Sequence, residues 1–115
     1  MKKTELSTLL RELEIPVNEG ITAQGNIGEY PRIVFWPYIE QDGMASGGGY
    51  YNNVTYQISF FARTPQHEKY LELRKKLRDQ GIHPVFYHEY VEKDPVFART
   101  WHTYFNLEVT EELDG

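Results

Sequence analysis

The ten residues from 54 to 63 read VTYQISFFAR, and their pattern is the clearest strand signal in the chain. Apolar residues occupy every second position, which is the period of a strand with one face buried against a core. These positions are Val54, Tyr56, Ile58, Phe60 and Ala62. Directly after the strand, Thr64 followed by Pro65 is typical of a helix N-cap with proline at the first helical position. We therefore expect a strand that leads into a helix.

The segment from 64 to about 80 predicts that helix. Tyr70, Leu73 and Leu77 recur at helical spacing and form one apolar stripe. Gly81 supplies a C-terminal stop, and Pro84 prevents the helix from continuing.

The N-terminal segment predicts another amphipathic helix, with Thr4 as its N-cap and its end near Glu14. Its apolar positions follow the i, i+3, i+4, i+7 spacing of one buried helix face. They are Leu6, Leu9, Leu10 and Leu13. Pro16 then disfavours helical angles at the residue before it, and we expect the glycine-rich segment 17–30 to be a loop or a weak strand.

Residues 32–40 predict a strand that is covered on both faces, because both of its alternating sets are apolar. One set is Ile33, Phe35 and Ile39, and the other is Val34, Trp36 and Tyr38. The helices of the domain cover one face, and we expect a second subunit on the other. Pro37 lacks a backbone N–H group, which predicts a sheet edge or a bulge at this point.

Two further strands are predicted, near 85–91 and from about 99 to 110, with a turn at Asp94 and Pro95. The element order is then α-β-β-α-β-β. We expect a single α+β domain over residues 1–115, with a mostly antiparallel four-stranded sheet and both helices packed on one face. A mobile glycine-rich hairpin loop is expected near 41–50, and a frayed acidic tail at 111–115.

Composition restricts the functions that this chain can have. Its 115 residues include 12 Lys and Arg against 17 Asp and Glu, and the formal net charge of −5 argues against sequence-specific binding of nucleic acid. The absence of cysteine excludes disulfides, thiol nucleophiles and thiolate zinc sites. No apolar stretch approaches the roughly 20 residues of a membrane span, and none follows Lys2 and Lys3 as in a secretory signal. We therefore expect a soluble cytoplasmic protein with no membrane partner.

Three patterns suggest chemistry, and each has a simpler alternative. His88 and His102 would face each other across a hairpin and bind a metal ion, or they are solvated polar residues. Glu89, Glu92 and Asp94 would hold magnesium, or they mark a strand end and a turn. The triple-glycine segment leads into a strand instead of a helix, which disfavours a phosphate-binding loop. We expect no cofactor, no metal ion and no enzymatic activity.

The helix predicted after residue 64 carries a basic surface, formed by Arg74, Lys75, Lys76 and Arg78. This surface is either a solvated face, in which Glu72 pairs with Lys76 at i, i+4, or a docking surface for an acidic partner. The acidic tail of a neighbouring copy of the chain would be such a partner. Self-association therefore has an electrostatic basis.

Four segments carry a resemblance to a known group of proteins: YPRIVF at 30–35, YQISFF at 56–61, FYHEYVE at 86–92 and HTYFNLEV at 102–109. With these segments the chain resembles the small tail-completion proteins of long-tailed bacteriophages and prophages, in the tail terminator or tail-to-head joining group. The resemblance implies a ring, typically of six copies, that caps the tail tube. It also implies two partners, the tail tube protein and the head connector protein. The location would be the bacterial host cytoplasm during assembly and then the virion tail or head–tail junction.

Other roles stay open beside this one. They are another head–tail connector or minor capsid component, a small metal-dependent nuclease, and a host-directed adaptor. A ring joins two different patches on neighbouring copies, and the strand at 32–40, the glycine-rich segment and the basic helix are the candidates for them. The predicted interface residues are Trp36, Tyr38, Met44, Ala45, Ser46, Gly47, Tyr50, Arg74, Lys75, Lys76 and Arg78.

Overall fold

Strand β3 (Tyr50–Ala62), which contains the alternating stretch, lies at the centre of the sheet. The computed structural model describes residues 2–20, 30–44, 50–91 and 100–113. Strand β3 pairs antiparallel with β2 (Arg32–Met44) on one side and with β5 (Thr100–Leu113) on the other. Strand β4 (Tyr87–Val91) pairs antiparallel with β5, and β1 (Val17–Glu19) pairs parallel with β2. The strand order is β1-β2-β3-β5-β4.

The described sheet therefore has five strands and is mixed, whereas the sequence predicts four antiparallel strands. The four predicted strands are all present. The additional one is β1, in the segment expected to be a loop or a weak strand, and it pairs with Ile33, Val34 and Phe35. Its three residues are too few for a recognisable alternation, so pairing with β2 defines it. The predicted α+β class is confirmed.

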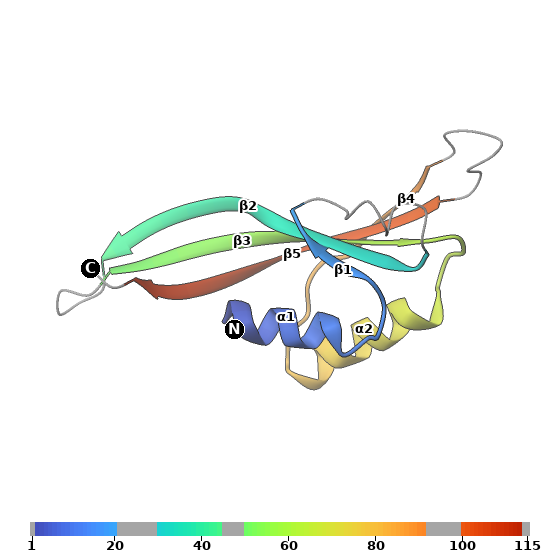
Figure 1. Ribbon diagram of the computed structural model, residues 1–115, viewed down its shortest axis with the longest axis horizontal. Helices are drawn as coiled ribbons and strands as arrows, with labels where there is room; N and C mark the ends of the chain where they lie inside the picture. Colours follow the sequence, from blue (N-terminus) through green and yellow to red (C-terminus); the bar gives the residue numbers. More distant parts are fainter. Residues whose placement is uncertain (1, 21–29, 45–49, 92–99, 114–115) are drawn as a thin grey trace.

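Both helices, α1 (Lys3–Arg11) and α2 (Glu68–Asp79), cover the same face of the sheet, as predicted (Figure 1). Their apolar stripes meet the inward side chains of the strands in one core, because each element is apolar on one side only. The helices contribute Leu6, Leu9, Leu10, Leu13, Tyr70, Leu73 and Leu77, and the strands contribute Ile33, Phe35, Val54, Tyr56, Ile58, Phe60, Ala62, Phe105 and Val109. No helix within these described ranges is long and apolar enough to cross a membrane.

Helix α1 begins one residue before Thr4, so the prediction of Thr4 as its N-cap is wrong. The N-cap position is Lys2, whose side chain makes no capping hydrogen bond. The helix ends at Arg11 instead of near Glu14, which has a positive φ of 58° that a helix does not allow. Leu13 nevertheless stays fully buried, because the chain after the helix still lies over the sheet.

Helix α2 begins after the predicted N-cap, Thr64. Gln66 has a φ of 53°, which prevents a helix from starting at Thr64. The N-cap is His67, whose Nδ1 accepts the backbone N–H of Lys69 at 3.1 Å. The predicted end is confirmed, since the helix stops just before Gly81, which takes a left-handed φ of 73°.

The bulge expected at Pro37 is present in the β2–β3 ladder. Pro37 lies opposite Tyr56 and Ile39 lies opposite Thr55, so that Tyr38 is an extra residue on β2. The alternation of the sequence places Ile39 in the same set as the helix-facing residues of this strand. That prediction is wrong, because the extra residue moves Ile39 to the opposite face.

Strands β2, β3 and β5 continue past the N-terminal end of α1 as a three-stranded extension (Figure 1). We call this extension the arm and define it as Glu40–Met44, Tyr50–Asn53 and Thr110–Leu113. Its ladders are continuous, from Gln41 opposite Asn53 to Met44 opposite Tyr50. The arm lengthens the molecule to 57 Å, against 29 and 22 Å in the other two directions.

The strands of the arm include residues that the sequence predicts to lie in a mobile loop near 41–50 and in a frayed tail at 111–115. Residues 41–44 and 50 belong to strands and not to a mobile loop, because cross-strand pairing continues to the end of the described hairpin. The Tyr51 ring lies beside Gly43 and occupies the space that a side chain would need there. Residues 111–113 likewise pair with β3 and are not a frayed tail. The rest of the predicted loop, 45–49, and of the predicted tail, 114–115, lies outside the described residues.

Candidate functional site

The sheet face opposite the helices, which we call the open face, carries a row of stacked side chains, and the row begins with two arginines. The guanidinium carbons of Arg63 and Arg32 each lie 4.8 Å from the centre of the Tyr30 ring. Arg32 also lies 4.7 Å from the centre of the Phe61 ring. A hydrogen bond of 3.1 Å joins the Tyr30 hydroxyl to Thr100, and it is the main cause that lowers the pKa of Tyr30 below 10.0. The two guanidinium groups lower that pKa further, while burial opposes them.

The row continues across β5 to the edge strand β4 as a series of rings. Phe61 stacks on His102 with ring centres 4.6 Å apart and planes only 9° from parallel. His102 lies 5.0 Å from Tyr104, and Tyr104 stacks on Tyr87 at 5.2 Å. The rings pack face to face or at a tilt against one another. The row therefore covers the strands that carry it, as the helices cover the other face of the sheet.

His102, one ring of this row, also forms a chain of hydrogen bonds with Ser59 and Glu89. The Nε2 atom of His102 lies 2.8 Å from Oγ of Ser59, and its Nδ1 atom lies 2.8 Å from Oε1 of Glu89. A serine beside an imidazole that a carboxylate orients is the arrangement that activates nucleophiles in many hydrolases. The Ser59 side chain is 0% exposed, however, and it lies on a flat central strand that is paired on both sides. The three residues therefore satisfy a buried hydroxyl and present no accessible nucleophile.

Sequence reasoning did not find this group, because its members come from three separate strands. Ser59 and Glu89 join through His102 only when β5 lies between β3 and β4, with His102 opposite both Phe61 and Glu89. Hairpin order alone does not give this arrangement. The only signal in the sequence is the alternation of side chains along each strand, which places all three residues on the face away from the helices.

The idea that His88 and His102 face each other is wrong. His88 lies opposite Thr103, so it points to the helix face, where its Nδ1 is 2.9 Å from the Thr103 hydroxyl oxygen. His102 is one residue out of phase and lies on the open face. Within the described ranges, no group of three or more His, Cys, Asp or Glu residues is placed to hold a metal ion. Of the predicted acidic cluster, Glu92 and Asp94 lie outside the described residues.

A cavity of about 160 Å³ lies on the helix face, between the start of α2 and the sheet. Aromatic and imidazole rings from both layers line it, among them His67, Tyr70, His88 and Trp101. Tyr70 is 2% exposed and its hydroxyl has no hydrogen-bond partner in the described structure. The cavity has room for a few water molecules or a small apolar group.

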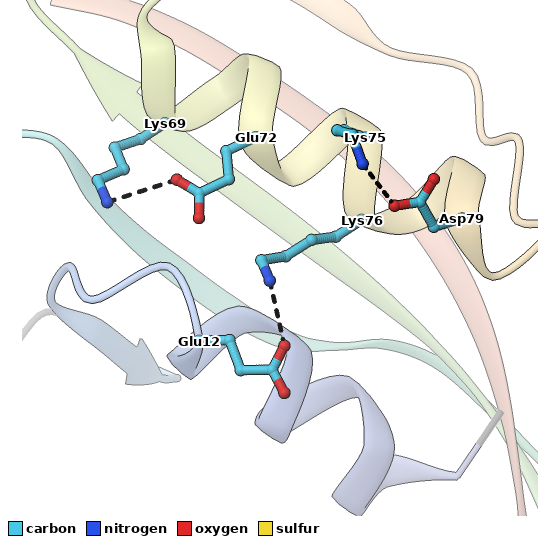
Figure 2. A network of polar contacts seen from close by, with 6 residues as sticks. All are labelled: Glu12, Lys69, Glu72, Lys75, Lys76 and Asp79. Atoms are coloured by element: carbon cyan, nitrogen blue, oxygen red, sulfur yellow. Dashed lines mark hydrogen bonds and ion pairs between the residues drawn. The ribbon is translucent and has the colours of Figure 1, made fainter.

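The three lysines of α2 form ion pairs within the molecule (Figure 2). The three ion pairs are Lys69–Glu72, Lys75–Asp79 and Lys76–Glu12, at 3.4, 2.9 and 3.2 Å. The predicted pair between Glu72 and Lys76 is therefore wrong. Lys76 instead reaches across to α1, because the two helices lie on the same face with these side chains between them.

Arg74 and Arg78 differ from the lysines. Neither has a carboxylate within ion-pair distance among the residues that the structure describes, and Arg74 lies 5.4 Å above the centre of the Phe86 ring. A hollow of about 90 Å³, which we call the basic hollow, opens where α2 ends. It is lined by Arg74, Arg78, Ile82, His83, Pro84 and Phe86. The hollow combines guanidinium groups with an apolar floor, which suits a carboxylate carried on a partly apolar surface.

Strand β2 has an exposed edge beyond Phe35, where β3 is its only neighbour among the described strands. Tyr38 and Ile39 are 59% and 54% exposed there, which is unusual for large apolar side chains in a strand. Glu40 and Asp42 follow, both exposed and neither in an ion pair with a described residue. Glu40 lies opposite Val54 and Asp42 opposite Asn52, on the helix side of the strand, whereas Ile39 lies opposite Thr55 on the other side, so these residues flank the strand edge from both faces. We call Tyr38, Ile39, Glu40 and Asp42 the acidic edge.

The predicted interface residues fall into three places. Trp36 is half-buried and Tyr38 is exposed, so β2 still presents apolar surface as expected. Met44 and Tyr50 are backbone partners in the last described pair of the β2–β3 ladder. Ala45, Ser46 and Gly47 lie outside the described residues. The four residues on α2 divide into the two paired lysines and the two arginines of the basic hollow.

The chain was also compared with family models and with curated protein sequences, and nothing matches in either comparison.

Proposed function

We propose that this chain is a structural protein of a phage tail, which assembles as a ring, caps the tail tube and joins it to the head connector. The observation that carries the proposal is the arm. Three strands continue past the helices as a thin acidic extension, and an exposed apolar strand edge lies beside it. An exposed apolar strand edge does not stabilise an isolated molecule, and it is typical of a region that becomes covered in an assembly.

The charge of the arm supports a place around a DNA passage. The arm contains Glu40, Asp42, Glu111 and Glu112 and no Lys or Arg, and Glu111 and Glu112 keep its charge negative even where Glu40 and Asp42 pair with a neighbouring copy. A surface of this sign repels phosphate groups and does not retain DNA that moves past it. The resemblance of the four quoted segments to tail-completion proteins points to the same role.

The alternatives use other parts of the molecule. A metal-dependent nuclease would use Glu89, whose Oε1 atom is hydrogen-bonded to His102, together with the predicted acidic residues Glu92 and Asp94. A host-directed adaptor would use the exposed β2 edge on a foreign partner instead of on a second copy. The proposed structural role involves no chemical step, so its tests measure assembly and not turnover.

The direct test uses tail tubes assembled from the tube protein encoded in the same genome. With the chain present, negative-stain electron microscopy should show tubes that carry a ring at one end and stop growing. The matched control is the variant Tyr38→Ser with Ile39→Ser, which removes the exposed apolar pair and should leave tubes uncapped. Tubes that ignore the wild-type chain, or DNA that it cleaves in the presence of Mg²⁺, would contradict the proposed function.

A further inference from the structure

We propose that neighbouring copies of this chain join head to tail, with the acidic edge of one copy docked in the basic hollow of the next. The inference rests on the proposed function, because it names the contact through which the ring would form. It goes beyond that function by assigning both sides of the contact to particular residues. The occupant of the basic hollow is thus a second copy of this chain.

Charge supports this pairing first. Most ion pairs that the structure describes are internal to the helix layer, yet two carboxylates and two guanidinium groups stay without an ionic partner on these two surfaces. The carboxylates are Glu40 and Asp42, and the cations are Arg74 and Arg78. Within the described residues neither set has an ionic partner, and docking the acidic edge of a second copy in the basic hollow would neutralise both sets at one contact.

The distribution of exposed apolar residues supports it independently. The large hydrophobic residues that the structure shows as exposed are Tyr38, Ile39, Leu71, Val85, Tyr87 and Tyr90. Two of them belong to the acidic edge. Leu71 lies one turn before Arg74 on α2, and Val85 lies between two residues of the basic hollow in sequence. Each charged surface therefore has an apolar margin, the composition of a contact that excludes water around its ion pairs.

The positions of the two surfaces determine the symmetry. The acidic edge lies on β2, where it includes Glu40 and Asp42 of the arm, while the basic hollow lies between the end of α2 and the segment that leads to β4. A contact between two different surfaces is heterologous, so each added copy again presents one free surface of each kind. Such a contact closes into a ring when the rotation between copies allows it.

Charge reversal in two separate variants tests the contact. One variant is Glu40→Lys with Asp42→Lys, and the other is Arg74→Glu with Arg78→Glu. Each alone brings like charges together, and we expect the dissociation constant for self-association to rise about tenfold or more. An equimolar mixture restores attraction at every contact, because reversed edges meet reversed hollows and native edges meet native hollows. The mixture should therefore assemble as the wild type does, with the two variants alternating.

Two matched controls separate this contact from a general effect of charge. Glu14→Lys with Glu108→Lys changes the net charge by the same amount as Glu40→Lys with Asp42→Lys, at two exposed residues outside the contact. Lys2→Glu with Arg11→Glu reverses two charges at the ends of α1, as the second variant reverses two on α2. Both controls should keep wild-type association, and circular dichroism should show all variants folded. A wild type that assembles while the reversed variants assemble equally well would overturn the head-to-tail contact and leave the proposed function standing. A wild type that never self-associates, alone or on tail tubes, would overturn both.

Discussion

The hydroxyl of Ser59 lies 2.8 Å from Nε2 of His102 and is wholly buried, although neither of the two described helices covers that face of the sheet. The imidazole provides the cover itself, since it accepts or donates the hydrogen bond of the serine and stacks on Phe61 at 4.6 Å. A side chain of one strand thus does for its neighbours what α1 and α2 do on the other face. Contacts between side chains of the sheet itself order the open face, which neither α1 nor α2 covers.

This relationship predicts unequal effects of two substitutions. His102→Ala removes the stacked ring and leaves the Ser59 hydroxyl without its partner, so we expect a loss of about 2–4 kcal/mol in the free energy of unfolding. Ser59→Ala leaves the ring in place and should cost only about 1 kcal/mol. Urea denaturation of both variants and of the double variant measures the difference. Equal losses in the two single variants would contradict the covering role of the imidazole.

The phenol of Tyr30 predicts a specific dependence on alkaline pH. Its pKa is lowered from 10.0 in the folded state, mainly by the Thr100 hydrogen bond, so the folded protein loses this proton before the unfolded chain does. The free energy of unfolding should therefore gain a contribution as the pH rises from the folded pKa to 10.0, and lose it as the pH falls again. Phenolate absorbance should show an early-titrating tyrosine that Tyr30→Phe removes. A titration unchanged in Tyr30→Phe would contradict the assignment.

The ion pair between Lys76 and Glu12 is predicted to contribute little to stability. Both side chains are partly exposed, at 28% and 55%, and water and salt screen the attraction. Lys76→Met should change the free energy of unfolding by about 0.5 kcal/mol or less at physiological salt. Thermal unfolding at low and high NaCl measures this effect, with Lys75→Met as the control on the same helix. A loss above about 2 kcal/mol would show that the pair is more important than its exposure implies.

Two leucines of α2 form a matched pair that separates folding from assembly. Leu73 is fully buried, and Leu73→Ala should lower the free energy of unfolding by about 2–5 kcal/mol. Leu71, one turn before Arg74 on α2, is 46% exposed, and Leu71→Ala should leave stability nearly unchanged but weaken self-association. Denaturation and sedimentation of both variants check the two effects. Leu71→Ala with native association would remove this residue from the contact.

Much of the fold follows from local sequence. The alternation at 54–63 predicts β3, and the leucine spacing predicts a helix whose stripe is buried in full. Pro37 predicts an edge or a bulge, because it has no N–H to donate to a ladder, and the structure has a bulge directly after it. These features depend on one segment at a time, and periodicity describes a single segment well.

Features that depend on two or more segments were not predictable in this way. Strand β1 exists because of its pairing with β2, and the start of α2 is set by the backbone of Gln66 and the imidazole of His67. The group of Ser59, His102 and Glu89 needs the register of three strands. The basic surface of α2 was foreseen, but its division into paired lysines and unpaired arginines depends on where α1 and the end of α2 lie.

The most direct test of the account is the mass of the purified chain, measured by light scattering over a range of concentrations with electron microscopy of the same samples. We expect the measured mass to rise with concentration from the 13.6 kDa monomer to about 82 kDa, the mass of six copies. Electron microscopy should then show a closed ring with a central hole. The same measurement in 0.5 M NaCl should shift the transition to higher concentration, because salt screens the pairing of the acidic edge with the basic hollow. A 13.6 kDa monomer at every concentration, with no ring on tail tubes, would show that this chain does not cap tails as a ring.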